Sequence, residues 1–186
     1  MLLWYNVSIY FMVVYYSKNA LDAGNQQERS KIKGWITGFV DGEGCFSVSI
    51  IKNSTTKSGW QIFPEFVITQ GEKSLKALQI IKNYFKCGNI FINNRYDNHN
   101  ENLYRFCIRS IHDLQEKVVP FFQENKLITF KKRDFKLFSE IIGMMSNKKH
   151  LKKKGFLEIA RKIEKMNRRK PSRFLKSSET IRRNRR

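Results

Sequence analysis

The chain has 186 residues, and its 36 Lys and Arg against 16 Asp and Glu give a formal net charge of +20. A hydrophobic fraction of 41%, with 15 Phe and 7 Tyr, can build a core, which excludes a wholly disordered basic chain. The length fits one domain with short extensions. The positive excess favours a polyanionic partner, with nucleic acid first and an anionic membrane surface second.

The cysteines and histidines limit the kinds of site that the chain can form. Cys45, Cys87 and Cys107 are an odd number without C-x-x-C spacing, which argues against a disulfide framework and a structural zinc site. They suit a reducing compartment. The three His are scattered, so a metal would be a hard cation held by oxygen atoms. Abundant Lys, Asn, Ile and Phe lead to the hypothesis of an AT-rich gene, such as that of an organelle.

Two extensions are expected to flank a domain over residues 30–166. Residues 1–29 begin with an apolar, uncharged stretch to Tyr16, which is shorter than the roughly 20 residues that span a bilayer. We interpret it as a disordered extension or a strand packed on the domain, with membrane anchoring as the minor alternative. Residues 167–186 hold nine Lys or Arg and the single acid Glu179, which fits either a solvated end or an arm that contacts phosphates.

The first predicted element of the domain is a helix over residues 30–41. Its apolar residues recur at i, i+3, i+4, i+7 and i+8, Ser30 is a plausible N-cap, and Gly42 and Gly44 would end the helix. Small residues lie on another face of this helix, where a second helix could approach closely. These small or short residues, with the acid at the end of the same face, are Gly34, Thr37, Gly38 and Asp41.

Alternating strand and helix periods fill the rest of the domain. Strands are expected over residues 45–52, 60–69, 89–95 and 103–109, and helices over 72–86, 110–121, 131–145 and 151–166. The sequence around Ser110 has the form of a capping motif that opens its helix. The order is therefore αββαββα followed by C-terminal helices, which is an α+β architecture.

The densest chemical signal lies at the end of the first helix. Glu43 is placed at a helix C-terminus, where unpaired carbonyls carry partial negative charge and a carboxylate is poorly placed as a cap. With the carbonyl of Gly42, Glu43 would make half of an oxygen-ligand site for a divalent cation. A two-fold related copy of the helix would bring a second acid to the same axis. The alternative is an ordinary surface acid at a helix end.

At these residues the sequence resembles the LAGLIDADG homing endonuclease family. Ile36 to Gly44 (ITGFVDGEG) is in register with the nine-letter motif, and its departures include Ile36, Thr37 and Glu43, which keep size or charge. The resemblance covers residues 30–145 and includes one copy of the motif. Single-copy members act as homodimers, so the resemblance implies a dimer built on Gly34, Thr37, Gly38 and Asp41. It also implies an antiparallel sheet saddle that binds double-stranded DNA.

The resemblance also implies roles for particular residues. Glu43 and the Gly42 carbonyl match the metal site, which would hold Mg²⁺ or Mn²⁺, and Asp41 matches an acid with a structural role. Gln70 resembles the polar residue that positions water near the metals. Lys131 resembles the basic residue near the scissile phosphate, with Lys132 as the alternative register. Gln70 and Lys131 could instead be an ordinary sheet-end amide and one lysine among many.

Strand alternation gives an independent test of this interpretation. The apolar side predicted to pack under the helices comprises Phe46, Val48, Ile50, Ile62, Phe66, Ile68, Ile90, Ile92, Tyr104, Phe106 and Ile108. The outward side includes Glu65 and Leu103, and its candidate DNA contacts are Ser47, Ser49, Ile51, Asn53, Gln61, Phe63, Asn89, Phe91, Asn93, Arg95 and Arg105. The side chains of Ser, Asn, Gln and Arg carry hydrogen-bonding groups that suit the donors and acceptors on base edges. The apolar Phe63, Phe91 and Leu103 are less expected on this face and fit either contacts with thymine methyl groups or a small error of register. A merely solvated face is the alternative.

The sequence therefore predicts a sequence-specific, metal-dependent DNA endonuclease of the intron-homing type, which is organelle-encoded and acts as a homodimer. The alternative on the same scaffold is an intron maturase, an RNA-binding splicing cofactor. The intact acids favour the nuclease, because RNA binding has no need of Glu43. A structural basic DNA-binding protein would leave the motif unexplained.

Overall fold

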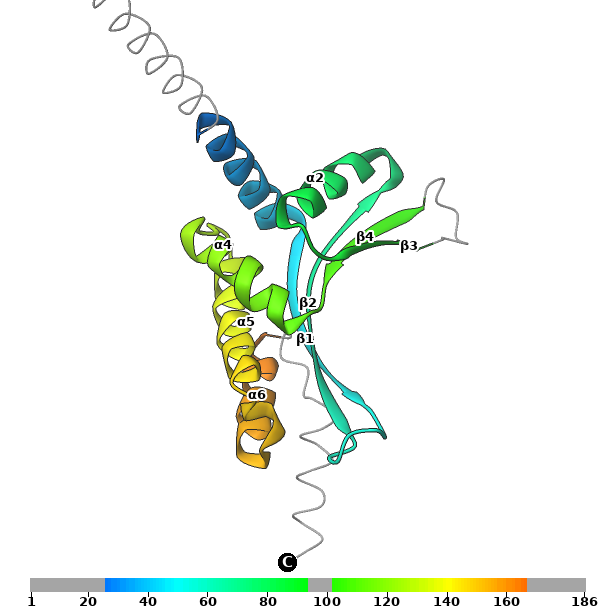
Figure 1. Ribbon diagram of the computed structural model, residues 1–186, viewed down its shortest axis with the longest axis vertical. Helices are drawn as coiled ribbons and strands as arrows, with labels where there is room; N and C mark the ends of the chain where they lie inside the picture. Colours follow the sequence, from blue (N-terminus) through cyan, green and yellow to red (C-terminus); the bar gives the residue numbers. More distant parts are fainter. Residues whose placement is uncertain (1–25, 94–101, 167–186) are drawn as a thin grey trace, which may run out of the picture.

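The computed structural model of the chain describes residues 26–93 and 102–166. A helix over residues 26–43, called the motif helix below, leads directly into a four-stranded antiparallel sheet of order β1-β2-β4-β3 (Figure 1). The strands are β1 (Gly44–Lys52), β2 (Trp60–Gly71), β3 (Asn89–Asn93) and β4 (Leu103–Ile108). The further helices are α2 (Leu75–Phe85), α3 (Ile111–Asp113), α4 (Val119–Glu124), α5 (Lys131–Ser146) and α6 (Lys153–Met166).

Short helical segments complete these elements. Single 3₁₀ turns over Glu72–Ser74 and Lys149–Leu151 precede α2 and α6, and a π-helical segment over Leu114–Val118 joins α3 to α4. Ser110 is the N-cap of α3, because its hydroxyl oxygen accepts a hydrogen bond of 3.2 Å from the backbone N–H of Asp113. This confirms the capping motif predicted from the sequence.

The helices cover one face of the sheet. The motif helix, α4, α5 and α6 lie on one side of it, α5 and α6 contact β1, and α2 contacts β2, β3 and β4 (Figure 1). Within the described ranges, the opposite face carries no helix (Figure 1). The long β1–β2 hairpin extends beyond β3 and β4. The α+β architecture and the helix-covered antiparallel sheet predicted from the sequence are confirmed.

A cluster of aromatic rings joins the sheet to the helices. Phe46 of β1 is 5% exposed, and its ring centroid lies 5.2 Å from that of Phe66, 5.3 Å from that of Phe122 and 5.4 Å from that of Phe138. Each buried ring removes a large apolar area from water, worth roughly 1.5–3 kcal/mol per side chain. The predicted inward residues buried in this core are Phe46, Val48, Ile62, Phe66, Ile68, Phe106 and Ile108.

Three sequence predictions need correction or fall outside the described residues. The first helix already includes residue 26, so Ser30 is not its N-cap; the preceding Gln, Glu and Arg residues are good helix formers. Ile92 is 52% exposed, because it lies on the edge strand β3 near the end of the helical cover. Arg95, residues 1–25 and the basic tail 167–186 lie outside the described ranges.

The described helices also bear on the membrane alternative. Among residues 26–93 and 102–166, no helix is both long enough and apolar enough to cross a membrane.

Gly88, between α2 and β3, gives a test of this fold. Its φ is +79°, and an added Cβ would lie 2.7 Å from the carbonyl oxygen of Cys107. We expect Gly88→Ala to lower the free energy of unfolding by about 1–3 kcal/mol, through backbone strain and steric contact. Gly59→Ala is the matched control, because φ is +70° there with no atom within 4 Å of the added Cβ. Urea unfolding measures both variants, and equal losses would contradict the steric contribution.

Candidate active site and sheet surface

The C-terminal end of the motif helix is closed by a lysine from α5. The ammonium of Lys131, the first residue of α5, donates hydrogen bonds to the carbonyl oxygens of Val40 at 3.2 Å, Asp41 at 3.0 Å and Gly42 at 2.5 Å. The last carbonyls of a helix have no intrahelical donor and carry partial negative charge. Lys131 therefore supplies both donors and positive charge at that end, whereas Lys132 is exposed.

The side chain of Asp41 binds the loop that precedes α5. Its carboxylate accepts hydrogen bonds from the backbone N–H of Ile128 at 2.8 Å and from the hydroxyl of Thr129 at 2.6 Å. The backbone N–H of Thr129 also donates to it, at 3.1 Å and 3.2 Å from its two oxygens. Burial raises the pKa of Asp41, but these hydrogen bonds and the charge of Lys131 outweigh burial, so the pKa lies below its ordinary value.

Three predicted catalytic residues lie at one end of the sheet. Glu43 is exposed as the last residue of the motif helix, and Gly44 pairs with Ile68 of β2. Gln70 lies two residues beyond that pair, half-buried and opposite Tyr104, at the same end of the sheet as Glu43. Lys131 also lies at this end, because its ammonium donates a hydrogen bond to the Gly42 carbonyl oxygen. The catalytic roles of Glu43, Gln70 and Lys131 remain predictions.

The donor chemistry of this end fits a hard divalent cation. It offers the Glu43 carboxylate and the carbonyl oxygens of the helix end, and such oxygen ligands suit Mg²⁺ and Mn²⁺. The carbonyls of Val40, Asp41 and Gly42 already accept hydrogen bonds from the Lys131 ammonium, so a cation on Gly42 would share that oxygen through its second lone pair. Within the described ranges, no three His, Cys, Asp or Glu side chains gather to hold a metal. Asp41 already uses its carboxylate on the loop before α5, so Glu43 is the carboxylate that one copy offers beside the backbone carbonyls of this helix end.

The predicted dimer face is open in the single chain. Gly34 and Gly38 are exposed, and a Cβ added to either would meet no atom within 4 Å. The Thr37 hydroxyl donates to the carbonyl oxygen of Lys33 at 2.8 Å, so it is occupied within the helix. Asp41 uses its carboxylate within its own chain, and its place at a dimer interface remains a prediction.

The outward side chains of the sheet lie in cross-strand rows. The pairs Ser47–Glu65, Ser49–Phe63 and Ile51–Gln61 join β1 to β2, and Asn89–Cys107, Phe91–Arg105 and Asn93–Leu103 join β3 to β4. The side-chain amide of Asn53 donates to the Gln61 side chain at 2.7 Å, which orients both amides on the β1–β2 hairpin. Ser49, Ile51, Asn89, Phe91 and Asn93 are exposed.

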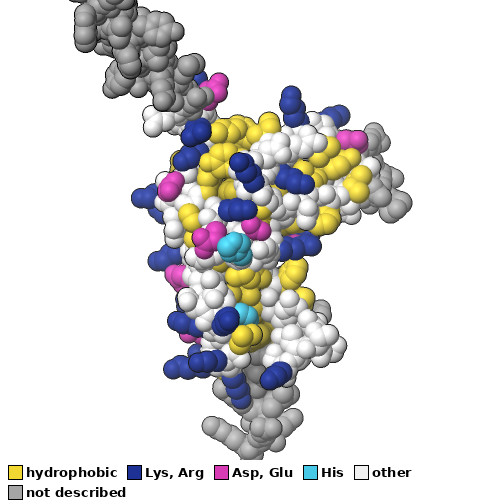
Figure 2. All heavy atoms as spheres, viewed as in Figure 1, with side chains coloured by type: hydrophobic (Ala, Val, Ile, Leu, Met, Phe, Trp, Pro, Cys, Tyr) yellow, Lys and Arg dark blue, Asp and Glu magenta, His cyan; other side chains and the backbone are white. Residues whose placement is uncertain are grey.

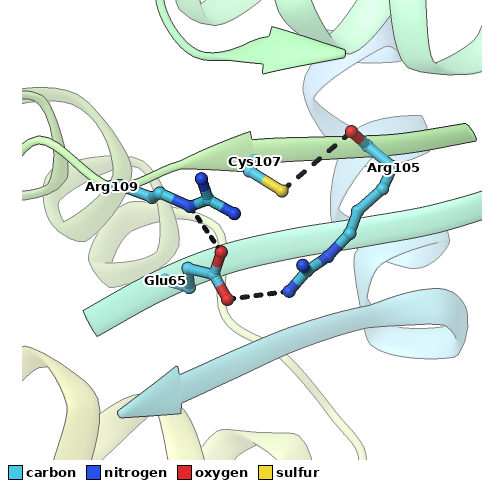
Figure 3. A network of polar contacts seen from close by, with 4 residues as sticks. All are labelled: Glu65, Arg105, Cys107 and Arg109. Atoms are coloured by element: carbon cyan, nitrogen blue, oxygen red, sulfur yellow. Dashed lines mark hydrogen bonds and ion pairs between the residues drawn. The ribbon is translucent and has the colours of Figure 1, made fainter. Parts of the chain in front are cut away.

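One buried acid organises the middle of this outer face (Figure 3). Glu65 of β2 is 7% exposed, and its two carboxylate oxygens accept hydrogen bonds from Arg105 Nη2 at 2.7 Å and Arg109 Nε at 2.6 Å. Cys107 lies between the two arginines in sequence, and its thiol donates to the Arg105 carbonyl oxygen at 4.0 Å. The hydrogen bond to Glu65 raises the pKa of Arg109 above its ordinary value. We call Glu65, Arg105 and Arg109 the Glu65 cluster.

Arg109 also belongs to this outer face, although it is not among the outward residues predicted from the sequence. Its guanidinium lies 5.4 Å from the ring centroid of Phe63 and 5.3 Å from that of Phe91. These distances are within cation–π range, so the two aromatic residues contact an arginine as well as solvent. Every second residue of β4 faces outward, beginning with Leu103, Arg105 and Cys107. Arg109 is the next residue in this alternation, so the sequence pattern could have identified it as outward.

Comparisons with known proteins agree with this architecture. A family model described as LAGLIDADG endonuclease matches residues 36–142, which is more than half of the chain. The chain belongs to the LAGLIDADG endonuclease family. The probable intron-encoded endonuclease 2 of Neurospora crassa is 37% identical over 127 residues, which cover 67% of this chain and 27% of that protein. The homing endonuclease I-ApeII of Aeropyrum pernix is 29% identical, over 64% of this chain and 67% of that protein.

Solved structures of LAGLIDADG endonucleases have the same fold. The crystal structure of the homing endonuclease I-TnaI is 37% identical with a TM-score of 0.69, and the match covers 80% of this chain and 97% of that chain. The structure of I-SmaMI bound to its uncleaved DNA target in the presence of calcium ions is 31% identical with a TM-score of 0.70, over 78% and 48% of the two chains. The chain spans about a third or less of the length of several curated fungal relatives.

The contacts of Asp41 predict a pH-dependent contribution to stability. Because its native pKa lies below the ordinary value of 3.8, its stabilisation is complete above about pH 4 and is lost as the pH falls through the native pKa. We expect Asp41→Asn to lower the free energy of unfolding near neutral pH by about 1–2 kcal/mol, with the difference from wild type shrinking below about pH 4. Urea unfolding between pH 2 and 7, with the exposed Glu116→Gln as control, measures this. A constant difference would contradict the assignment.

Proposed function

We propose that this chain is a sequence-specific double-strand DNA endonuclease of the intron-homing type, which acts as a homodimer with Mg²⁺ or Mn²⁺. The observation that carries the proposal is the end of the motif helix, where the exposed Glu43 carboxylate stands beside carbonyls that already bind a lysine cation. The gene would be an organellar intron gene. Relatives named as intron-encoded endonucleases and the composition of the chain support that origin.

Each residue at this end has a role in phosphodiester hydrolysis. Glu43 and the Gly42 carbonyl would hold the metal, which supplies an activated water and neutralises charge on the phosphate. Lys131 would add positive charge where negative charge develops in the transition state. Gln70 can order water by hydrogen bonding without titrating. This arrangement favours the nuclease over an RNA-binding maturase, because RNA binding requires no acid at the helix end.

A second copy would complete the acidic centre. The exposed Gly34 and Gly38 leave room for another helix, and hydrophobic side chains stay exposed around the motif helix and α2 on the face in Figure 2. Trp35 of the motif helix is 38% exposed, and Ile128 and Phe130 of the loop bound by Asp41 are 91% and 71% exposed. Exposed apolar side chains of this size are typical of an interface. Pairing two motif helices would bring the two Glu43 carboxylates together.

The proposed substrate surface is the outer face of the sheet. It carries polar and arginine side chains on neighbouring strands, and the whole chain has a net charge of +20. Positive charge gives affinity for the phosphate backbone, and side chains on the sheet supply the donors and acceptors that read base edges. The DNA-bound structure of I-SmaMI, whose matched part has the same fold, supports double-stranded DNA as the partner.

Glu43→Gln tests the metal site. We expect cleavage of the intron-less host-gene junction with Mg²⁺ to fall by more than about a hundredfold, because a metal ligand is lost. Specific binding of the same duplex should persist, because no base contact is removed. Glu28→Gln is the matched control, since it changes an exposed acid on the same helix. Cleavage by Glu43→Gln at near the wild-type rate would show that the metal site is assigned wrongly.

Gly38→Leu tests the dimer. The single chain has space at this position, and Leu is a better helix former than Gly, so the monomer should fold normally. The added side chain should prevent close approach of a second motif helix and give a monomer in sedimentation velocity. Gly143→Leu in α5, where an added Cβ also meets no atom within 4 Å, serves as the control. An unchanged Gly38→Leu dimer would place the interface on another surface.

A further inference from the structure

In the Glu65 cluster, the carboxylate is more deeply buried than the two arginine side chains that bind it. The side chain of Glu65 is 10% exposed, whereas those of Arg105 and Arg109 are 40% and 41% exposed. Both carboxylate oxygens are within 2.7 Å of a guanidinium nitrogen. A buried carboxylate that accepts two charge-assisted hydrogen bonds is strongly held in place, and it holds its partners in turn. The outer surface therefore presents two oriented guanidinium groups.

Most N–H donors of each guanidinium group are not bonded to Glu65. Arg109 donates through Nε, so its two terminal amino groups hold four further N–H donors; Arg105 donates through one N–H of Nη2. A guanidinium edge with two parallel N–H groups matches the O6 and N7 acceptors of guanine in the major groove. Fixing the group in advance lowers the conformational entropy lost on binding.

Aromatic side chains hold Arg109 in a second way. Phe63 of β2 and Phe91 of β3 each contact its guanidinium, and they come from strands on the two sides of β4. The position of Arg109 is thus set by an acid that binds its Nε and by two rings close to its guanidinium carbon. Electrostatic attraction to the phosphate backbone depends on the amount of positive charge near it, whereas bidentate reading of a base edge also depends on how the guanidinium is oriented.

The charges of the cluster also argue against a phosphate site. Two arginines and one carboxylate have a net charge of +1, and removing the acid would raise it to +2. A surface that only neutralised phosphates would bind more strongly without Glu65. The acid is therefore explained by orientation and not by attraction.

We propose that Glu65 is a positioning residue for DNA specificity, which fixes Arg105 and Arg109 so that their outward edges read guanines of the target. The proposal rests on the proposed function, since it concerns how the same sheet recognises DNA. It adds Glu65 and Arg109 to the residues that determine specificity. It also gives Phe63 and Phe91 a role as supports of Arg109.

The test is a binding selection from a library of fully randomised DNA duplexes, with Ca²⁺ in place of Mg²⁺. Wild type, Glu65→Gln and Glu158→Gln are compared, and the last is a charge-matched control at an exposed position of α6. We expect Glu65→Gln to lose about tenfold or more discrimination at a few guanine positions, symmetric in both half-sites. Its affinity for random duplexes should be equal to or higher than that of wild type, and Glu158→Gln should select the wild-type sequence.

If thermal melting shows that the Glu65→Gln protein is unfolded, Arg109→Lys takes its place in the selection. This variant keeps the charge but lacks the planar fork, and it should lose discrimination at a subset of the same positions. If the folded Glu65→Gln, or Arg109→Lys in its place, selects the wild-type sequence with unchanged discrimination, the positioning role is overturned while sequence-specific binding stands. If the wild-type chain selects no sequence, the proposed function itself fails, and the role of Glu65 fails with it.

Discussion

The carbonyls at the C-terminal end of the motif helix have no hydrogen-bond donor within the helix, and the rest of this structure depends on how they are satisfied. They carry partial negative charge at the point where the chain turns into β1, next to the exposed Glu43. Lys131 satisfies three of them, and Asp41 binds the loop that positions Lys131. The helix end, the loop and the start of α5 are therefore held together by contacts between residues about 90 positions apart in sequence.

This arrangement separates two tasks on one small domain. The end of the motif helix gathers oxygen donors and a lysine, which are the groups that metal-assisted hydrolysis needs. The outer face of the sheet holds oriented amides and arginines, which suit the reading of base edges. The aromatic core around Phe46 connects the two, because it fixes the helices against the inner face of the strands that carry the outer side chains.

The sequence predicted the layers of the fold better than the contacts of its polar groups. Period-two alternation identified the buried side of the sheet, because burial of Phe46, Phe66 and Phe106 follows directly from the pleat. The helix start and the exposure of Ile92 were predicted wrongly, because they depend on upstream helix formers and on where the helical cover ends. The Glu65 cluster joins residues 40 and 44 positions apart, and only the strand register shows that they meet.

The most direct test of this account is a crystal structure of the full chain bound to its target duplex with Ca²⁺. We expect two copies with their motif helices side by side, and cations held by the Glu43 carboxylate and the Gly42 carbonyl of each. The outer face of both sheets should lie in the major groove. A complex in which the two motif helices lie apart, or in which Glu43 binds no cation near the scissile phosphates, would contradict the assignment of this helix end as the catalytic centre.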